Sequence, residues 1–91
     1  RWAPRLAALA PHFGVHSPHE AKPEKIEQFK TKAAAGGHHD PTYAGMIASV
    51  DDSVGRIVAL LEELSLSDNT LIIFTSDNGG VGGYEREGIQ G

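Results

Sequence analysis

The sequence contains no cysteine, which excludes disulfide bonds, thiolate metal ligands and a cysteine nucleophile within its 91 residues. It has no apolar run near the ~18 residues that a membrane-spanning helix needs, and its start lacks the order of a secretory signal peptide. The eight Lys and Arg residues are scattered and the net charge is −4. No partner among nucleic acids or anionic membranes is therefore expected.

A chain of 91 residues makes at most one small domain with a modest core. The sequence begins on Arg1, and it ends on the glycine-rich run at residues 88–91, which resembles the middle of a loop. We therefore expect residues 1–91 to be one part of a larger domain.

An apolar run at residues 70–76 stops abruptly at Asp77 and Asn78. The run is rich in Ile and Phe and has no charge, Pro or Gly, which predicts a strand buried on both faces of a parallel sheet. Ligand sites in such sheets lie beyond the carboxyl ends of the strands. Carboxylate and amide oxygens suit calcium or magnesium, and Gly79 and Gly80 permit close approach of the backbone. The same residues also form a common turn that binds nothing, and this alternative stays open.

Two helices are predicted upstream of that strand. Residues 22–32 form a brief amphipathic helix, and residues 41–64 form a long one, with Asp40 as its cap and Pro41 in its first turn. The apolar stripe of the long helix comprises Tyr43, Met46, Ile47, Val50, Val54, Ile57, Val58, Leu61 and Leu64. We expect Asp51 and Asp52 to lie on the polar side of this helix, with Arg56 as the ion-pair partner of Asp52; paired catalytic acids are the alternative.

Residues 6–10 are predicted to form a first strand, followed by a loop that carries His16. Strand, helices and strand then make a right-handed crossover in which both strands are parallel. Parallel strands place their carboxyl ends on one edge, so His16 is expected beside Asp77 and Asn78. The predicted fold class is α/β, a partial and mainly parallel sheet with crossover helices, whose remaining strands come from elsewhere in the domain.

Three blocks of this sequence, in order and spacing, resemble the central segment of type I sulfatases, the arylsulfatase-like members of the alkaline phosphatase superfamily. The resemblance covers residues 11–91, and its most specific part runs from Asp51 to Gly80. The blocks are Val15-His16-Ser17-Pro18 with Ala21-Lys22-Pro23-Glu24, then Tyr43-Ala44-Gly45-Met46-Ile47 with Asp51-Asp52-Ser53-Val54-Gly55-Arg56-Ile57, and then residues 68–80.

The resemblance implies a sulfuric ester hydrolase with one calcium ion and an alkaline-phosphatase-like fold. It implies that Asp77 and Asn78 coordinate the calcium and that His16 contacts the sulfate group. It further implies a sulfate ester or a sulfated glycan as substrate, the remainder of the catalytic domain as partner, and a periplasmic, secreted or lysosomal location.

The nucleophile of that family is a formylglycine made from the first residue of a Cys/Ser-x-Pro-x-Arg motif, and the 91 residues contain no such motif. The nearest text, at residues 2–5, has neither the residue nor the spacing. The chain alone is therefore expected to be inactive, with the formylglycine elsewhere in its parent chain. Two alternatives stay open: a phosphodiesterase or phosphonate hydrolase of the same superfamily, and a noncatalytic truncated homologue.

Four further histidines, His12, His19, His38 and His39, raise the hypothesis of a zinc site. Their spacing matches no compact zinc motif. Histidines in loops are more often solvated, and we expect that here.

Overall fold

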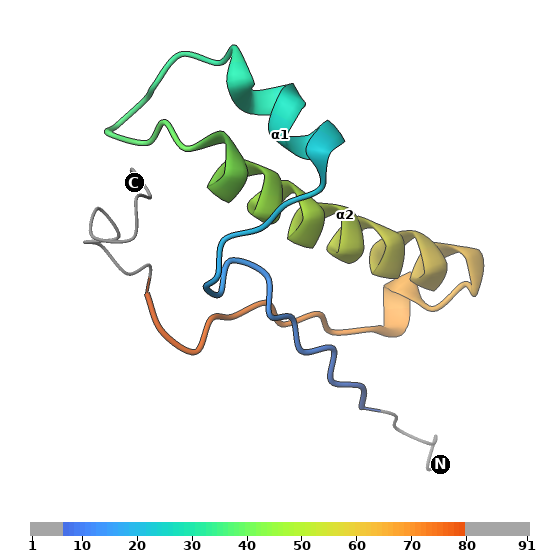
Figure 1. Cartoon of the computed structure of the whole chain (residues 1–91). Helices are drawn as coiled ribbons and strands as arrows, with labels where there is room; N and C mark the ends of the chain where they lie inside the picture. Colours follow the sequence, from blue (N-terminus) through green and yellow to red (C-terminus); the bar gives the residue numbers. More distant parts are fainter. Residues whose placement is uncertain (1–6, 80–91) are drawn as a thin grey trace, which may run out of the picture.

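The structure, a computed structural model, describes residues 7–79 as a pair of helices flanked by irregular chain (Figure 1). Its elements are helix α1 (Pro23–Lys30), the long helix α2 (Pro41–Glu63) and a short 3-10 helix, η1 (Ser67–Asn69). Leu6 of the first predicted strand, residues 2–5, Gly80 and the glycine-rich run at 88–91 lie outside the described residues. No described helix is long and apolar enough to cross a membrane.

Helix α2 confirms the long helix that was predicted for residues 41–64. The carboxylate of Asp40 accepts hydrogen bonds from the backbone N–H groups of Thr42 and Tyr43, at 2.8 and 3.2 Å, so it satisfies two of the donors that the first turn exposes. Pro41 occupies the first turn, where no hydrogen bond is lost. The helix ends before Ser65, whose φ of 56° is left-handed.

Helix α1 confirms the shorter helix predicted for residues 22–32, although it begins one residue later and ends two residues earlier. Pro23 begins it, Glu24 lies in the first turn and Lys30 in the last, so the charges complement the helix dipole at both ends. The chain then reverses in a tight turn closed by two backbone hydrogen bonds between Ala35 and His38, at 3.0 and 3.1 Å. Gly36 and Gly37 provide the positive φ angles that this turn requires.

Helices α1 and α2 pack closely because Gly45 has no side chain at their crossing. A Cβ atom at Gly45 would lie 3.1 Å from the Cβ of Ala21 and 3.2 Å from that of Lys25. Gly45 and Met46 are the only residues of α2 that are buried. An ion pair between Lys25 and Asp52 also joins the two helices.

The ion pair predicted between Asp52 and Arg56 is wrong, because Asp52 pairs with Lys25 instead. Residues 52 and 56 are four apart on one helix, but the packing of α1 brings an ammonium group to Asp52 from another element. Since the Asp52 side chain remains more than half exposed, this ion pair contributes little stability.

The predicted strands do not pair in the part of the chain that the structure describes. Residues 7–10 are irregular, and residues 70–76 are extended but hydrogen-bond to no neighbouring strand. Leu71 is 85% exposed and Ile73 77% exposed, so the apolar run is not buried. The parallel sheet, and with it the crossover of two parallel strands, stays a prediction.

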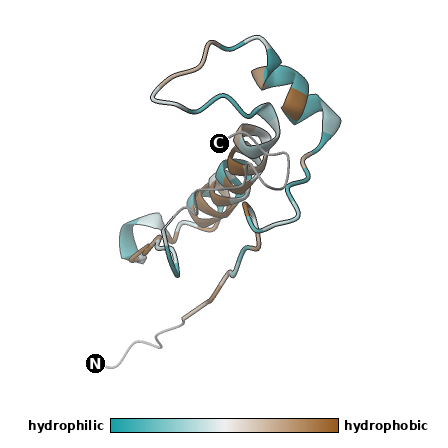
Figure 2. Cartoon of the chain, turned by 60° about the vertical axis from the view of Figure 1, so that its left-hand side comes forward, coloured by the Kyte–Doolittle hydropathy of each residue, from teal (hydrophilic) through white to brown (hydrophobic). Residues whose placement is uncertain are grey.

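The apolar stripe of α2 is only partly covered by the described residues. Met46, with 7% exposure, is its one buried side chain, whereas Ile47, Ile57, Val58 and Leu64 are exposed. Figure 2 shows apolar segments recurring along α2. Residues 71–74 are also apolar and exposed, and folded domains usually cover side chains of this kind with further elements.

Substitution of Gly45 by Val is expected to destabilise the helix pair, because the added methyl groups would overlap Ala21 and Lys25. Gly55→Val is the matched control, since Gly55 lies in the same helix and a Cβ there meets nothing within 4 Å. Both changes alter helix propensity equally, so we expect Gly45→Val to be less stable than Gly55→Val by about 1–3 kcal/mol. Thermal unfolding followed by circular dichroism at the helical band measures the difference. Equal midpoints would show that α1 does not pack at Gly45.

Candidate functional site

The loop before α1 contains His16 and rests directly on α2. A turn closes where the backbone N–H of His16 donates to the carbonyl of Phe13 at 3.1 Å, with Val15 at a φ of 65°. Gly14 lies against Val50 so closely that a Cβ on Gly14 would be 2.2 Å from the Val50 Cγ2. Any larger residue at position 14 would push the loop away from the helix.

His16 lies at the outer side of this loop with its ring orientation fixed by its neighbour. Its Nδ1 lies 2.6 Å from the carbonyl oxygen of Ser17. A carbonyl only accepts, so Nδ1 carries the proton and donates it. The other ring nitrogen, Nε2, then accepts a hydrogen bond when the ring is neutral and donates one when the ring is protonated. The side chain is exposed, so Nε2 is accessible to a ligand.

His12 is held in the same way and reaches α2. Its Nδ1 donates to the carbonyl of Ala10 at 2.8 Å, and its Nε2 lies 2.6 Å from the hydroxyl oxygen of Ser53. Since Nδ1 carries the proton, the Ser53 hydroxyl donates to Nε2. His12 is an exposed loop histidine, as the sequence predicts, but the sequence does not predict its hydrogen bond to Ser53. No spacing rule connects residues 12 and 53, because only the docking of the loop on α2 brings them together.

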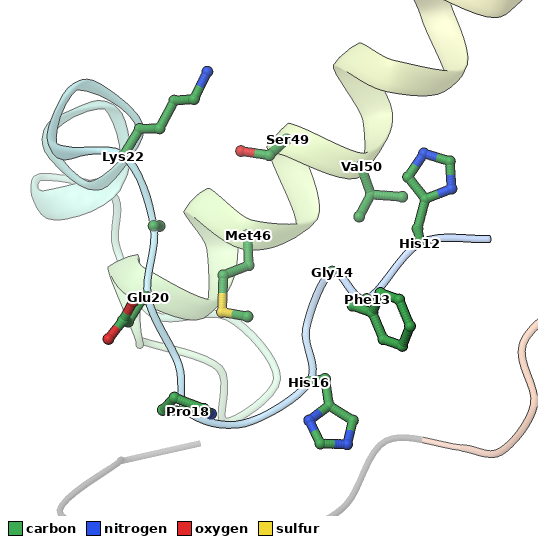
Figure 3. Close-up of a pocket in the computed structure, with 11 residues that line it drawn as sticks. His12, Phe13, Gly14, His16, Pro18, Glu20, Lys22, Met46, Ser49 and Val50 are labelled. Atoms are coloured by element: carbon green, nitrogen blue, oxygen red, sulfur yellow. The ribbon is translucent and has the colours of Figure 1, made fainter. Parts of the chain in front are cut away.

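An open groove of about 640 Å³ lies between this loop and α2. His12 and His16 line it from the loop, and Met46 and Val50 line it from the helix (Figure 3). The groove therefore combines two imidazoles with an apolar floor. We call it the loop–helix groove.

Asp77 and Asn78 lie at a bend that follows the extended run, as predicted for the end of that segment. The side-chain Nδ2 of Asn78 donates to the backbone carbonyl of Gly79 at 2.7 Å, and the Ser76 hydroxyl donates to the backbone carbonyl of Asn78. The Asn78 side-chain oxygen is thus the atom that can face a cation, next to the exposed Asp77 carboxylate. Both are hard oxygen donors, so the donor chemistry fits calcium.

These two residues supply only part of a calcium shell. Calcium takes about 6–8 oxygen ligands. Among residues 7–79 no three His, Asp or Glu side chains are grouped closely enough to hold a metal ion. Among the described residues, no cluster of carboxylates and imidazoles therefore completes a site at Asp77.

The structure does not bring all the predicted site residues together. Within the described residues, no hydrogen bond or ion pair joins His16 to Asp77 or Asn78. Their common edge requires the parallel pairing of residues 70–76, which these residues do not form. The shared site of His16, Asp77 and Asn78 therefore stays a prediction.

The remaining histidines occupy separate places. The ring of His19 packs against Tyr43, with the ring centres 5.3 Å apart. His38 lies in the turn between the helices, and His39 Nδ1 is 3.1 Å from the carbonyl of Gly37. These positions are spread over two loops and show no common centre for a zinc ion.

Comparison with known proteins identifies the family. A family model described as Sulfatase matches residues 5–90, which is nearly the whole chain. The chain is 43% identical over 51 residues to N-acetylgalactosamine-6-sulfatase of Sus scrofa, a match that covers 56% of this chain and 10% of that protein. It is 40% identical over 76 residues to the uncharacterized sulfatase YdeN of Escherichia coli, which covers 84% of this chain and 12% of that protein.

A third relative has a broader name. The multifunctional alkaline phosphatase superfamily protein PehA of Trinickia caryophylli is 55% identical over 38 residues, covering 42% of this chain and 7% of that protein. No solved structure matches the chain. The chain spans about a tenth of the length of the curated relatives it matches. Because the family model covers residues 5–90 of 91, the chain belongs to the sulfatase family.

Proposed function

We propose that this chain forms part of the active site of a calcium-dependent sulfuric ester hydrolase. The observation that carries the proposal is the extent of the family match, which spans residues 5–90 and so includes both His16 and the Asp77–Asn78 pair. The name of the pig relative contains a sulfated amino sugar, which supports a sulfate ester or sulfated glycan as the substrate class.

His16 contacts a sulfate oxygen in this proposal. Its Nδ1 is engaged by the Ser17 carbonyl, so only Nε2 is available, and Nε2 donates a hydrogen bond only in the protonated ring. An imidazolium placed there both donates a charge-assisted hydrogen bond and offsets the negative charge that develops as the ester bond breaks. His16 therefore acts as a cationic anchor for the sulfate group rather than as a base.

Asp77 and Asn78 hold calcium through their side-chain oxygens in this proposal. A bound calcium ion would supply positive charge that stabilises the anionic oxygens of the substrate. The nucleophile is not among the 91 residues, since no Cys/Ser-x-Pro-x-Arg motif occurs in them. The contribution of this chain is thus substrate and metal binding rather than covalent attack.

The fold of the parent domain follows from the same proposal. Residues 70–76 pair as a strand of a mainly parallel sheet, and the exposed stripe of α2 packs against that sheet. This arrangement would cover Ile47 and Leu64 together with Leu71 and Ile73, which are all exposed in the described residues. It would also bring the bend at Asp77 to the edge of the sheet where the His16 loop begins.

A phosphodiesterase or phosphonate hydrolase is the second candidate. The match to PehA favours it, because that protein is named as a multifunctional member of the alkaline phosphatase superfamily. Oxygen ligands for a dication and a cationic imidazole suit phosphate and sulfate alike. Rates of the active protein on aryl sulfates, aryl phosphodiesters and aryl phosphonates distinguish the two. A sulfate ester preference supports the proposal, and a phosphodiester or phosphonate preference supports the second candidate.

Asp77→Ala, in a sulfatase domain that includes this chain, is expected to abolish calcium-dependent hydrolysis of an aryl sulfate. The change removes an anionic ligand, and the loss should be only partly restored by added calcium. Asp68→Ala is the matched control, since it removes the same charge from the exposed η1. Initial rates at increasing calcium concentrations provide the measurement. Unchanged activity with unchanged calcium dependence would refute the ligand assignment.

His16→Ala is expected to lower turnover by about 100- to 1,000-fold, as loss of a donor to developing charge does in other enzymes. Thermal stability should change little, because the side chain is exposed and, among the described residues, hydrogen-bonds only to Ser17. His38→Ala, in the turn between the helices, is the control. A steep fall in melting temperature with a normal rate per folded molecule would instead make His16 structural.

The 91-residue chain by itself is expected to bind calcium with a dissociation constant weaker than about 10⁻⁴ M, because two side chains fill only a minority of the ligand positions. Titration calorimetry of the isolated chain measures this. Submicromolar binding would mean that the chain holds a complete site.

A further inference from the structure

The hydrogen bond between His12 and Ser53 has no role in the proposed chemistry, yet it links the His16 loop to the long helix. It joins residues 41 positions apart at 2.6 Å, with the His12 ring fixed from its other side by the carbonyl of Ala10. Both ring nitrogens of His12 are therefore occupied. Its ring is a spacer between the loop and α2 rather than a group presented to a ligand.

A second contact holds the loop at an adjacent point of α2. Gly14 lies against Val50, which is three residues before Ser53 and therefore on the same face of the helix. Between these two contacts and His16 lies only the turn closed by the His16 N–H and the Phe13 carbonyl, at 3.1 Å. The position of His16 thus follows from how the loop is seated on α2.

We infer that His12 and Ser53 are positioning residues that hold His16 at the distance from α2 that sulfate binding requires. The inference rests on the proposed function of His16. The two residues touch no substrate in this account, and they act by restricting the movement of the loop. Misplacement of a binding group by about 1 Å can cost about 100-fold in rate, so a single hydrogen bond at the base of the loop is enough to matter.

The hydrogen bond requires an acceptor atom at the position of His12 Nε2 and a hydroxyl donor at residue 53. His12→Gln keeps an acceptor at a similar reach, and Ser53→Thr keeps the hydroxyl. His12→Ala and Ser53→Ala remove one partner each.

The test measures kcat and KM for an aryl sulfate in the active sulfatase domain that contains this chain. His12→Ala and Ser53→Ala are each expected to lower kcat by about 10- to 100-fold, with a smaller change in KM. The double variant should be no slower than either single variant, because both remove the same hydrogen bond. His12→Gln and Ser53→Thr should recover most of the rate. His38→Ala, a loop histidine outside the loop–helix groove, should retain normal rates.

Hydrogen exchange at the His16 amide reports the seating of the loop without any need for activity. We expect His12→Ala and Ser53→Ala to increase exchange at this amide while the amides in the middle of α2 keep their protection. Normal kcat in both alanine variants, or losses that add in the double variant, would overturn the inference. Unchanged exchange at His16 would overturn it as well. Faster exchange in a parent protein that hydrolyses no sulfate ester would refute the proposed function and support the positioning of the loop.

Discussion

The close approach of α1 to α2 at Gly45 is the contact on which the described structure depends. Because Gly45 has no side chain, Ala21 and Lys25 reach the surface of α2, and Met46 becomes the one buried large apolar residue among those described. The Lys25–Asp52 ion pair extends this contact by two helical turns. The His16 loop enters α1 directly, so the crossing at Gly45 also sets where that loop lies.

The middle of α2 therefore has two faces that differ in what contacts them. On one side it receives α1 and the loop, through Gly45, Val50 and Ser53. On the other side it presents apolar residues that nothing in the described chain covers. The family match offers a physical reason for this difference, because the curated relatives are several times longer than the 91 residues. Elements beyond these would cover the exposed side, and the first side holds the loop with His16, the proposed sulfate contact.

The helices could be predicted from the sequence, and the sheet could not be tested. Asp40 and Pro41 mark the start of α2, and its apolar residues repeat with the helical period. Local sequence signals are therefore sufficient to predict this helix. A strand needs hydrogen bonds to another strand, and in a parallel sheet that partner is distant in the sequence. The extended run at residues 70–76 has no such partner in the described chain.

Contacts between elements were the least predictable part of the site. Helical spacing predicts Arg56 as the ion-pair partner of Asp52, whereas the packing of α1 against α2 makes Lys25 its partner. His12 carried no signal of its bond to Ser53, because the two meet only when the loop docks. Residue type and family resemblance point to His16, Asp77 and Asn78. These signals suggest what each residue does, but they do not give the distances between the three side chains.

The central claim is that His16 and the Asp77–Asn78 pair face one pocket. A crystal structure of a complete sulfatase domain containing this chain, grown with calcium and sulfate, tests it most directly. The account predicts calcium within about 2.3–2.6 Å of the Asp77 and Asn78 side-chain oxygens, with His16 Nε2 in hydrogen-bond contact with the sulfate. Calcium bound without these oxygens, or His16 on the opposite side of the domain, would contradict it.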